Sequence, residues 1–410
     1  MTALPSPSTG DLFVKYQQPE FSVYTPPQDN KISFSFQLSK RLTHNTVKPL
    51  GYQLPYLLNT FSVDTNLTSI CNNSQLRYYI EPPLNIDLNI GADIFIRKPE
   101  FYKPGLDGIL LSLKQRYYNN IKLNRKEQNF KDVQSYRSSI FAWRGLLSKM
   151  AVAPYSKDDW AFVACKVGNA ILLDELLTVA ELNNKIKIQS TTFQRMCYWG
   201  YKFEQYCTTP DLKAALNGKR SMDLGNEAVN SCEAFCCVIK SKLGEHLLVM
   251  GAETDCSLPI QNLVEGDMSN FIELKTSRVF QNINDKDIFE RHKLLKIWAQ
   301  SYLAGVPLVV VGFRDEKGIV KNVIKYKTLE IPKLLKLDNT KGLWESNVCL
   351  NFLNNLFDFI KSSVSLQYNE AAYIFRYDPI MHRVTVEIDH SNTRNFFANA
   401  YVSFADELEL

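Results

Sequence analysis

Two short segments, GAETD and ELK, carry the residues that are best suited to do chemistry. Each lies in a stretch whose composition predicts a β-strand. Residues at i and i+2 of a strand share one face, so Glu253 points with Asp255 and Glu273 points with Lys275. If the two strands are neighbours, three carboxylates and one ammonium meet. Carboxylates gathered in this way repel one another unless a cation such as Mg²⁺ or Mn²⁺ lies among them.

That combination of groups is typical of a metal-dependent enzyme that cleaves phosphodiesters. A lysine beside the metal can orient or deprotonate a water, or stabilise charge on a phosphoryl oxygen. Each motif alone also fits a solvent-facing strand that carries cross-strand ion pairs. The two motifs together, with the features that follow, favour the catalytic interpretation.

Three further residues in separate segments could complete such a site. Glu204 ends the segment GYKFE on a largely apolar and aromatic predicted helix, where the alternative is a solvated glutamate at a helix end. Gln300 lies in WAQS among apolar residues, so a partly buried amide there needs hydrogen-bond partners. Arg144, in WRGLL, needs an anionic partner, which is either a structural carboxylate or a substrate phosphate.

The elements that must position these residues can be predicted from periodicity and turn residues. We expect helices over 191–207, 287–303 and 347–363, and hairpins whose strands are 160–167 with 170–176, 233–240 with 245–255, 307–314 with 319–326, and 371–377 with 384–388. A further strand is expected at 270–279 and another at 31–37. The run 105–127, rich in Lys, Arg and Tyr, is interpreted as a solvated helix face.

The pattern of elements predicts an α/β (α+β) fold. We expect a mixed, mostly antiparallel sheet flanked by helices, in a single compact domain over residues 1–410, with the motifs concentrated in residues 140–330. Residues 1–30, rich in Pro, Ser and Thr, are expected to form a flexible arm.

Composition sets bounds on partner and compartment. The chain has 410 residues and a formal net charge of +4, which permits a nucleic-acid partner without requiring one. Its nine cysteines include no C-x-x-C pair, so a zinc ribbon is not expected, and several lie in apolar runs typical of reduced core thiols. Reduced cysteines and the lack of an expected signal peptide or membrane span favour the cytosol or nucleus.

The segments WRGLL, GYKFE, GAETD, ELK and WAQS, in this order, resemble the motifs of the DXO family of RNA 5′-end decapping nucleases. The resemblance covers residues 140–315 and is greatest to the fungal members. One fungal branch is the nuclear partner of the nuclear 5′–3′ exoribonuclease, and another is a stand-alone cytoplasmic decapping exonuclease. The resemblance therefore implies a core similar to PD-(D/E)xK nucleases and, as partners, RNA and an exoribonuclease.

The resemblance also implies a role for each motif residue. The ligands of two Mg²⁺ or Mn²⁺ ions would be acidic side chains and one backbone carbonyl, those of Glu204, Glu253, Asp255, Glu273 and Leu274. Lys275 would hold the attacking water or neutralise developing charge, Gln300 would support the active centre, and Arg144 would lie near the 5′ phosphates. The family often has a hydrophobic residue where this chain has Thr254, which should point to the opposite face of its strand.

The activities implied are removal of pyrophosphate from 5′-triphosphate RNA and of whole caps, either unmethylated or incompletely methylated guanosine caps or NAD. A stabilising subunit of an exoribonuclease remains a second hypothesis, and a DNA nuclease of the same core fold a distant third. Lys275, Arg278, Lys293 and Lys296, with nearby aromatic residues, could track single-stranded RNA, although a solvated face explains them equally well.

Overall fold

The computed structural model describes most of the chain, namely residues 13–14, 34–37, 49–187, 191–218, 227–337, 343–391 and 396–408. The predicted arm at 1–30 lies outside the described residues except for Phe13–Val14, which form strand β1. Phe34–Gln37 form β2 and confirm the second half of the strand expected at 31–37.

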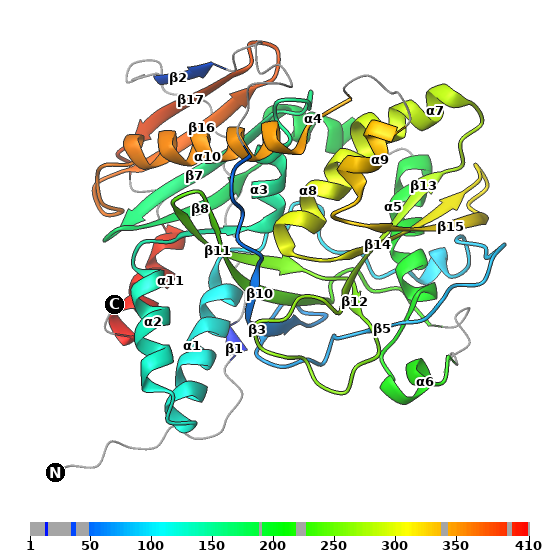
Figure 1. The fold of residues 1–410 in the computed structure, drawn as a ribbon, viewed down its shortest axis with the longest axis horizontal. Helices are drawn as coiled ribbons and strands as arrows, with labels where there is room; N and C mark the ends of the chain where they lie inside the picture. Colours follow the sequence, from blue (N-terminus) through cyan, green and yellow to red (C-terminus); the bar gives the residue numbers. More distant parts are fainter. Residues whose placement is uncertain are drawn as a thin grey trace.

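The described strands form two sheets (Figure 1). The larger has the order β1-β4-β3-β10-β11-β6-β8-β7-β16-β17-β2 and the smaller the order β15-β14-β13-β12-β5-β9. The remaining strands have these bounds: β3 Tyr56–Val63, β4 Ser69–Ile70, β5 Tyr78–Tyr79, β6 Ile140–Trp143, β7 Trp160–Val167, β8 Ala170–Leu176, β9 Thr208–Thr209, β10 Ala234–Leu243, β11 His246–Glu253, β12 Cys256–Ser257, β13 Phe271–Arg278, β14 Leu308–Arg314, β15 Val320–Lys327, β16 Ala372–Asp378 and β17 Arg383–Asp389.

Helices fill the space between the sheets and cover their outer faces. Their bounds are α1 Asp107–Lys122, α2 Lys126–Tyr136, α3 Arg144–Ala151, α4 Val179–Lys187, α5 Thr191–Tyr206, α6 Leu212–Leu216, α7 Ile283–Ile288, α8 Leu295–Ala304, α9 Ile331–Leu337, α10 Ser346–Ser363 and α11 Phe396–Glu407, with a 3₁₀ turn η1 at Ala92–Ile94. Helix α3 packs on β6 and β11 of the large sheet, α8 packs on β14 of the small sheet, and the two helices pack against each other (Figure 1). Helix α5 packs on β13, while α1 and α11 cover the other face of the large sheet.

Both sheets are mixed, and most strand pairs are antiparallel, which confirms the predicted fold class. The parallel pairs among the described strands are β6 with β11, β6 with β8, β5 with β12 and β13 with β14. The four predicted hairpins are present. Gly305, in the left-handed conformation at φ 72°, ends α8 where the sequence indicated.

Two predictions on helices need correction. The helix expected at 287–303 begins earlier, because Asn282 caps α7 by accepting a hydrogen bond from the Asp285 N–H at 3.1 Å, and it includes a π-helical segment, Phe289–Leu294. The run 105–127 is not mainly a solvated face. Helix α1 buries Ile109, Leu110 and Leu113, whose spacing directs them into the core.

No helix among the described residues is long and apolar enough to cross a bilayer. All nine cysteines are free, and most of them are buried, as expected for reduced core thiols.

Candidate active site

The two acidic segments meet through a crossing between sheets, not through neighbouring strands. Strand β11, which ends at Glu253, belongs to the large sheet, and β13 belongs to the small one. The chain crosses at Thr254 and Asp255 and then enters β12, which pairs with β13. The premise that the two strands are neighbours is therefore wrong, because two residues between β11 and β12 carry the chain from one sheet to the other.

The crossing places Asp255 against the ELK strand. The Leu274 N–H donates a hydrogen bond to Asp255 Oδ2 at 2.6 Å. Thr254 is buried, with its N–H bonded to the Phe235 carbonyl at 2.9 Å and its hydroxyl 3.5 Å from Cys237 Sγ. Thr254 thus anchors the crossing to β10, and Glu253 and Asp255 flank that anchor.

Lys275 lies between two of the carboxylates. Its Nζ is 2.6 Å from Glu273 Oε1 and 3.5 Å from Asp255 Oδ2, and it donates to the Leu274 carbonyl at 3.0 Å. Burial on its own would lower the pKa of Lys275, but the nearby carboxylates outweigh it and raise that pKa above its usual range. The ammonium is therefore charged at neutral pH and acts as a donor and counter-charge in this arrangement, not as a base.

Arg144 ties the large sheet to the same centre. It is the first residue of α3 and is buried, with Nη2 donating to the Glu253 carbonyl at 2.8 Å and Nη1 3.6 Å from Glu273 Oε1. Burial would raise the pKa of Glu273, but Lys275 and Arg144 overcome it and hold that pKa below its usual value. A carboxylate is thus the anionic partner of Arg144 in this structure, and contact with a substrate phosphate stays a prediction.

The remaining two carboxylates have no protein partner. Within the described part of the chain, neither the Glu204 nor the Glu253 carboxylate makes a hydrogen bond or ion pair. Glu204 projects from α5, and burial together with the charges of Asp255, Glu253 and Glu273 raises its pKa well above the usual value, despite Lys275. The site therefore holds more negative charge than its two cations neutralise.

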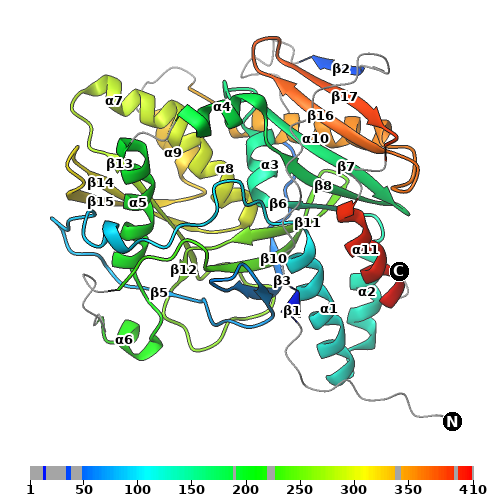
Figure 2. The ribbon, with the colours of Figure 1, turned by 180° about the vertical axis from the view of Figure 1, so that it is seen from behind.

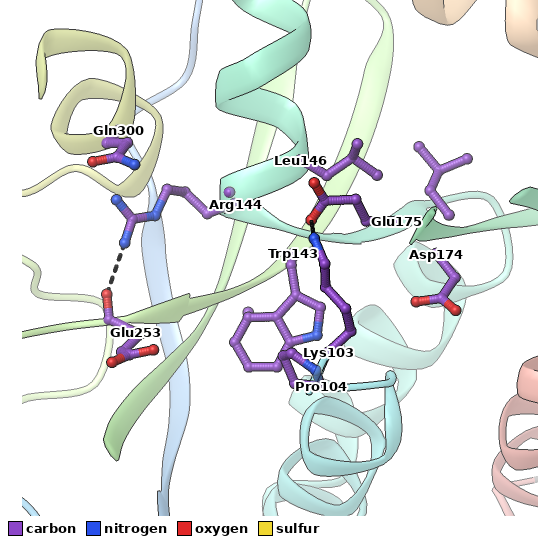
Figure 3. Close-up of a pocket in the computed structure, with 12 residues that line it drawn as sticks. Lys103, Pro104, Trp143, Arg144, Leu146, Asp174, Glu175, Glu253 and Gln300 are labelled. Atoms are coloured by element: carbon purple, nitrogen blue, oxygen red, sulfur yellow. Dashed lines mark hydrogen bonds and ion pairs between the residues drawn. The ribbon is translucent and has the colours of Figure 1, made fainter. Parts of the chain in front are cut away.

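A cavity of about 210 Å³ adjoins this centre (Figure 3). Arg144, Gln300 and Glu253 form its wall on the side of the carboxylates. Gln300 projects from α8 beside Arg144 (Figure 3), and its amide has no hydrogen-bond partner among the described residues. The buried partners expected for this amide are thus not found, because the side chain faces the cavity.

Sequence reasoning missed the opposite wall of the cavity, formed by Lys103, Asp174 and Glu175. Glu175 accepts ion pairs from Lys103 at 2.8 Å and from Lys149 at 2.6 Å. Burial and the neighbouring Glu175 raise the pKa of Asp174 to about 7. Two adjacent carboxylates at the end of an apolar strand were the available sequence signal, but nothing in their spacing connects them to the motifs.

Among the described residues, no three His, Cys, Asp or Glu side chains are already arranged as a metal-binding group. The Lys275 ammonium occupies the position between Glu273 and Asp255, and Asp255 also accepts the Leu274 N–H. The predicted metal ligands lie in one region, but their role as ligands stays a prediction.

Comparison with known proteins places this geometry in a family. The family model described as RAI1 like PD-(D/E)XK nuclease matches residues 53–402. The chain is 30% identical over 315 residues to the decapping nuclease RAI1 of Neurospora crassa, covering 74% of this chain and 72% of that protein. It is 31% identical over 340 residues to the decapping and exoribonuclease protein of Xenopus laevis, covering 80% of each.

Solved structures agree on the fold. Candida albicans Rai1, in complex with pU5-Mn²⁺, superposes with a TM-score of 0.77 at 22% identity, covering 92% of this chain and 99% of that one. Scheffersomyces stipitis Rai1, in complex with (3′-NADP)⁺ and calcium, gives a TM-score of 0.75 at 23% identity, covering 88% and 97%. The chain belongs to the RAI1/DXO family of decapping nucleases, hydrolases that act on RNA 5′ ends, with a core of the PD-(D/E)XK nuclease type.

Proposed function

We propose that this protein is a divalent-metal-dependent RNA 5′-end hydrolase that removes pyrophosphate from 5′-triphosphate RNA and releases whole caps. The caps would be unmethylated or incompletely methylated guanosine caps and NAD. One observation carries the proposal: Lys275 lies among Glu273, Asp255 and the Leu274 carbonyl, beside a cavity lined by Arg144 and Gln300.

The residues present fit divalent cations. The donor set is made of hard oxygen atoms, which Mg²⁺ and Mn²⁺ prefer. Glu273 Oε2 is buried without a hydrogen-bond partner among the described residues, and the Glu204 and Glu253 carboxylates have no partner there either. We assign metal binding to oxygen atoms of Glu204, Glu253, Asp255, Glu273 and Leu274. Two bound ions would supply an activated water and stabilise the leaving oxygen.

The protein's own groups would position the substrate. The Lys275 ammonium would donate hydrogen bonds to the water or to a phosphoryl oxygen, since its raised pKa keeps it charged. The Gln300 amide would donate to a substrate oxygen that enters the cavity. Arg144 would hold Glu273 in place and offer a second charge to the 5′ phosphates.

Two observations on relatives support the range of substrates. Candida albicans Rai1 was solved with pU5-Mn²⁺ and Scheffersomyces stipitis Rai1 with (3′-NADP)⁺ and calcium. A 5′-phosphorylated RNA and a dinucleotide resemble the product and the cap that the proposal requires. Similar identity to a protein named decapping and exoribonuclease protein favours a second activity, 5′–3′ degradation of the 5′-monophosphate RNA that remains.

We also propose a nuclear location and a partnership with a nuclear 5′–3′ exoribonuclease, supported by similarity to fungal proteins named RAI1. A stand-alone cytoplasmic enzyme is the alternative. Residues 1–410 would act as one nuclease domain, with the motifs in residues 140–330.

The test is incubation of the purified protein with 5′-triphosphate, NAD-capped and unmethylated-capped RNAs, with Mg²⁺ or Mn²⁺ and with chelator. We expect pyrophosphate, NAD and the intact cap dinucleotide as metal-dependent products. A matched 5′-monophosphate RNA reports exonuclease activity separately. If no product forms from any 5′ end with either metal, the enzyme assignment fails. In that case co-purification with a 5′–3′ exoribonuclease would favour the stabilising-subunit hypothesis.

A further inference from the structure

Gly200 lies inside helix α5, and nothing in the described protein requires a glycine there. A Cβ built on Gly200 meets no atom within 4 Å, whereas one on Gly108 of α1 would meet the Phe61 ring at 2.7 Å. Packing therefore explains the glycine in α1 but not the one in α5. Glycine inside a helix costs stability relative to alanine, so neither packing nor helix propensity explains the glycine at this position.

The open space lies next to the carboxylates. Gly200 and Tyr201 precede Glu204 by four and three residues, so all three lie on neighbouring positions of one helix face. Tyr201 therefore lies one helical turn from Glu204 on α5. Burial, then the charges of Glu253 and Glu204, raise the pKa of its phenol, in agreement with this position. The Tyr201 hydroxyl makes no hydrogen bond with any described residue, and the side chain is only partly buried.

A loop supplies an aromatic ring and a cation beside Tyr201. The Phe95 ring lies 5.8 Å from the Tyr201 ring, and the Arg97 guanidinium lies 5.8 Å from the Phe95 centroid. Arg97 is exposed and has no ion pair within the described residues. The loop follows η1, passes α5 and reaches the start of α1 (Figure 2). Lys103, in the same loop, lines the cavity. Aromatic rings next to unpaired cations are typical of surfaces that bind single-stranded nucleic acid.

We propose that single-stranded RNA lies across this face of α5, with its sugar-phosphate backbone against Gly200, one base stacked on Tyr201, and a phosphate on Arg97. The proposal rests on the RNA 5′-end hydrolase proposed above and names the surface that holds the nucleotides next to the cleaved bond. Phe95 supports the Tyr201 ring and keeps it in place.

The first test uses Gly200→Ala and Gly200→Leu. Because the added side chain meets no protein atom, Tm should stay unchanged or rise for Gly200→Ala. Affinity for a 5′-monophosphate oligouridine, measured with Ca²⁺ to suppress cleavage, should fall about tenfold for Gly200→Ala and further for Gly200→Leu. Unchanged affinity in both variants overturns the proposal. A fall in Tm for Gly200→Ala also overturns it, since the protein itself would then fill that space.

The second test pairs Tyr201→Leu with RNAs that lack one base at a time. For the wild type, removal of one particular base should weaken binding about 5- to 100-fold, the range for base–aromatic stacking. The same removal should have little further effect in Tyr201→Leu, while Tyr201→Phe should behave like the wild type. Phe130→Leu, at an exposed ring on α2, is the matched control and should leave the pattern intact.

Arg97→Gln completes the test of the phosphate contact. It should reduce the slope of log affinity against log salt by about 0.7, the value for one phosphate contact with a single strand. Lys131→Gln on α2 is its control and should leave the slope unchanged. The protein could cleave RNA 5′ ends while removal of each base changes the affinity equally in the wild type and Tyr201→Leu. In that case the proposed RNA-binding surface is wrong, and the enzyme assignment stands. If no RNA is bound or cleaved at all, both fail.

Discussion

Lys275 and Glu273 point from the same strand into one ion pair, with Nζ 2.6 Å from Oε1, while the same ammonium is 3.5 Å from Asp255 Oδ2. The Glu273 side chain is only 4% exposed, so its charge depends on this lysine and on Arg144. The Lys275 ammonium therefore neutralises buried carboxylates, and it also lies where it can stabilise charge that develops on a phosphoryl group.

Replacing Lys275 with alanine should separate these two tasks. Without metal, the buried carboxylates lose their counter-charge, which typically costs about 3–5 kcal/mol of stability. Added Mn²⁺ should restore much of this loss, and cleavage with metal should still fall about 10²–10³-fold. Thermal denaturation with and without Mn²⁺ and single-turnover cleavage measure the effects. Unchanged cleavage would place Lys275 outside the mechanism.

Glu253→Gln should abolish hydrolysis without unfolding the protein. The Glu253 side chain is exposed and its carboxylate has no partner among the described residues, so the free energy of unfolding should change by less than about 0.5 kcal/mol. Mn²⁺ affinity, followed by calorimetry, should fall together with activity. Glu245→Gln, at the turn that precedes β11, serves as a control that should retain both. Full activity in Glu253→Gln would remove Glu253 from the metal site.

Asp255 makes stability depend on pH in an unusual direction. Burial raises its pKa from 3.8 to about 6, so the folded protein holds this proton where the unfolded chain has lost it. The group's contribution is then fully present below pH 4 and is lost as the pH rises to about 6, by up to about 3 kcal/mol without metal. Asp255→Asn should remove this contribution to the pH dependence of the free energy of unfolding. The free energy of unfolding of the wild type and of Asp255→Asn can be measured by urea denaturation from pH 4 to 7. If this free energy depends on pH in the same way in both proteins, the raised pKa of Asp255 is contradicted.

Arg144→Ala tests whether the buried arginine also recognises substrate. Loss of its contacts to the Glu253 carbonyl and the Glu273 carboxylate should cost about 3–5 kcal/mol of stability. If Arg144 also contacts the 5′ phosphates, KM should rise more for 5′-phosphorylated RNA than for 5′-hydroxyl RNA of the same sequence. Arg144→Lys keeps the positive charge but cannot make both guanidinium contacts. Its stability and its KM should lie between those of the wild type and Arg144→Ala. Equal effects on both RNAs would leave Arg144 a purely structural role.

Gln300→Ala should affect substrate binding alone. Its amide faces the cavity without a partner among the described residues, so the variant should keep its Tm while its KM rises by about 5- to 10-fold, the loss of one hydrogen bond. Gln300→Glu should raise the KM further, because it adds a negative charge beside the substrate phosphates. A fall in Tm with unchanged KM would show that the amide has a protein partner.

Local sequence patterns were enough to predict the helices and strands around the site and the types of side chain that form it. Strong periodicity and turn residues predicted β7, β8 and α5 almost to the residue, because these patterns act over a few positions. The sequence motifs also identified the acidic residues, the lysine, the arginine and the glutamine that the structure brings to one region. Chemistry of that kind depends on side-chain type, which the sequence states directly.

The way in which these residues come together depends on long-range packing. The sequence predicted that the carboxylates come together on the condition that the two strands are neighbours. Strands β11 and β13 lie in different sheets, and the crossing anchored by buried Thr254 connects these sheets. The π-helical segment Phe289–Leu294 was not predicted, and the sequence did not connect the adjacent carboxylates at Asp174 with the cavity. Each depends on contacts between segments far apart in the chain, and local propensity carries no information about which distant surface will be packed against it.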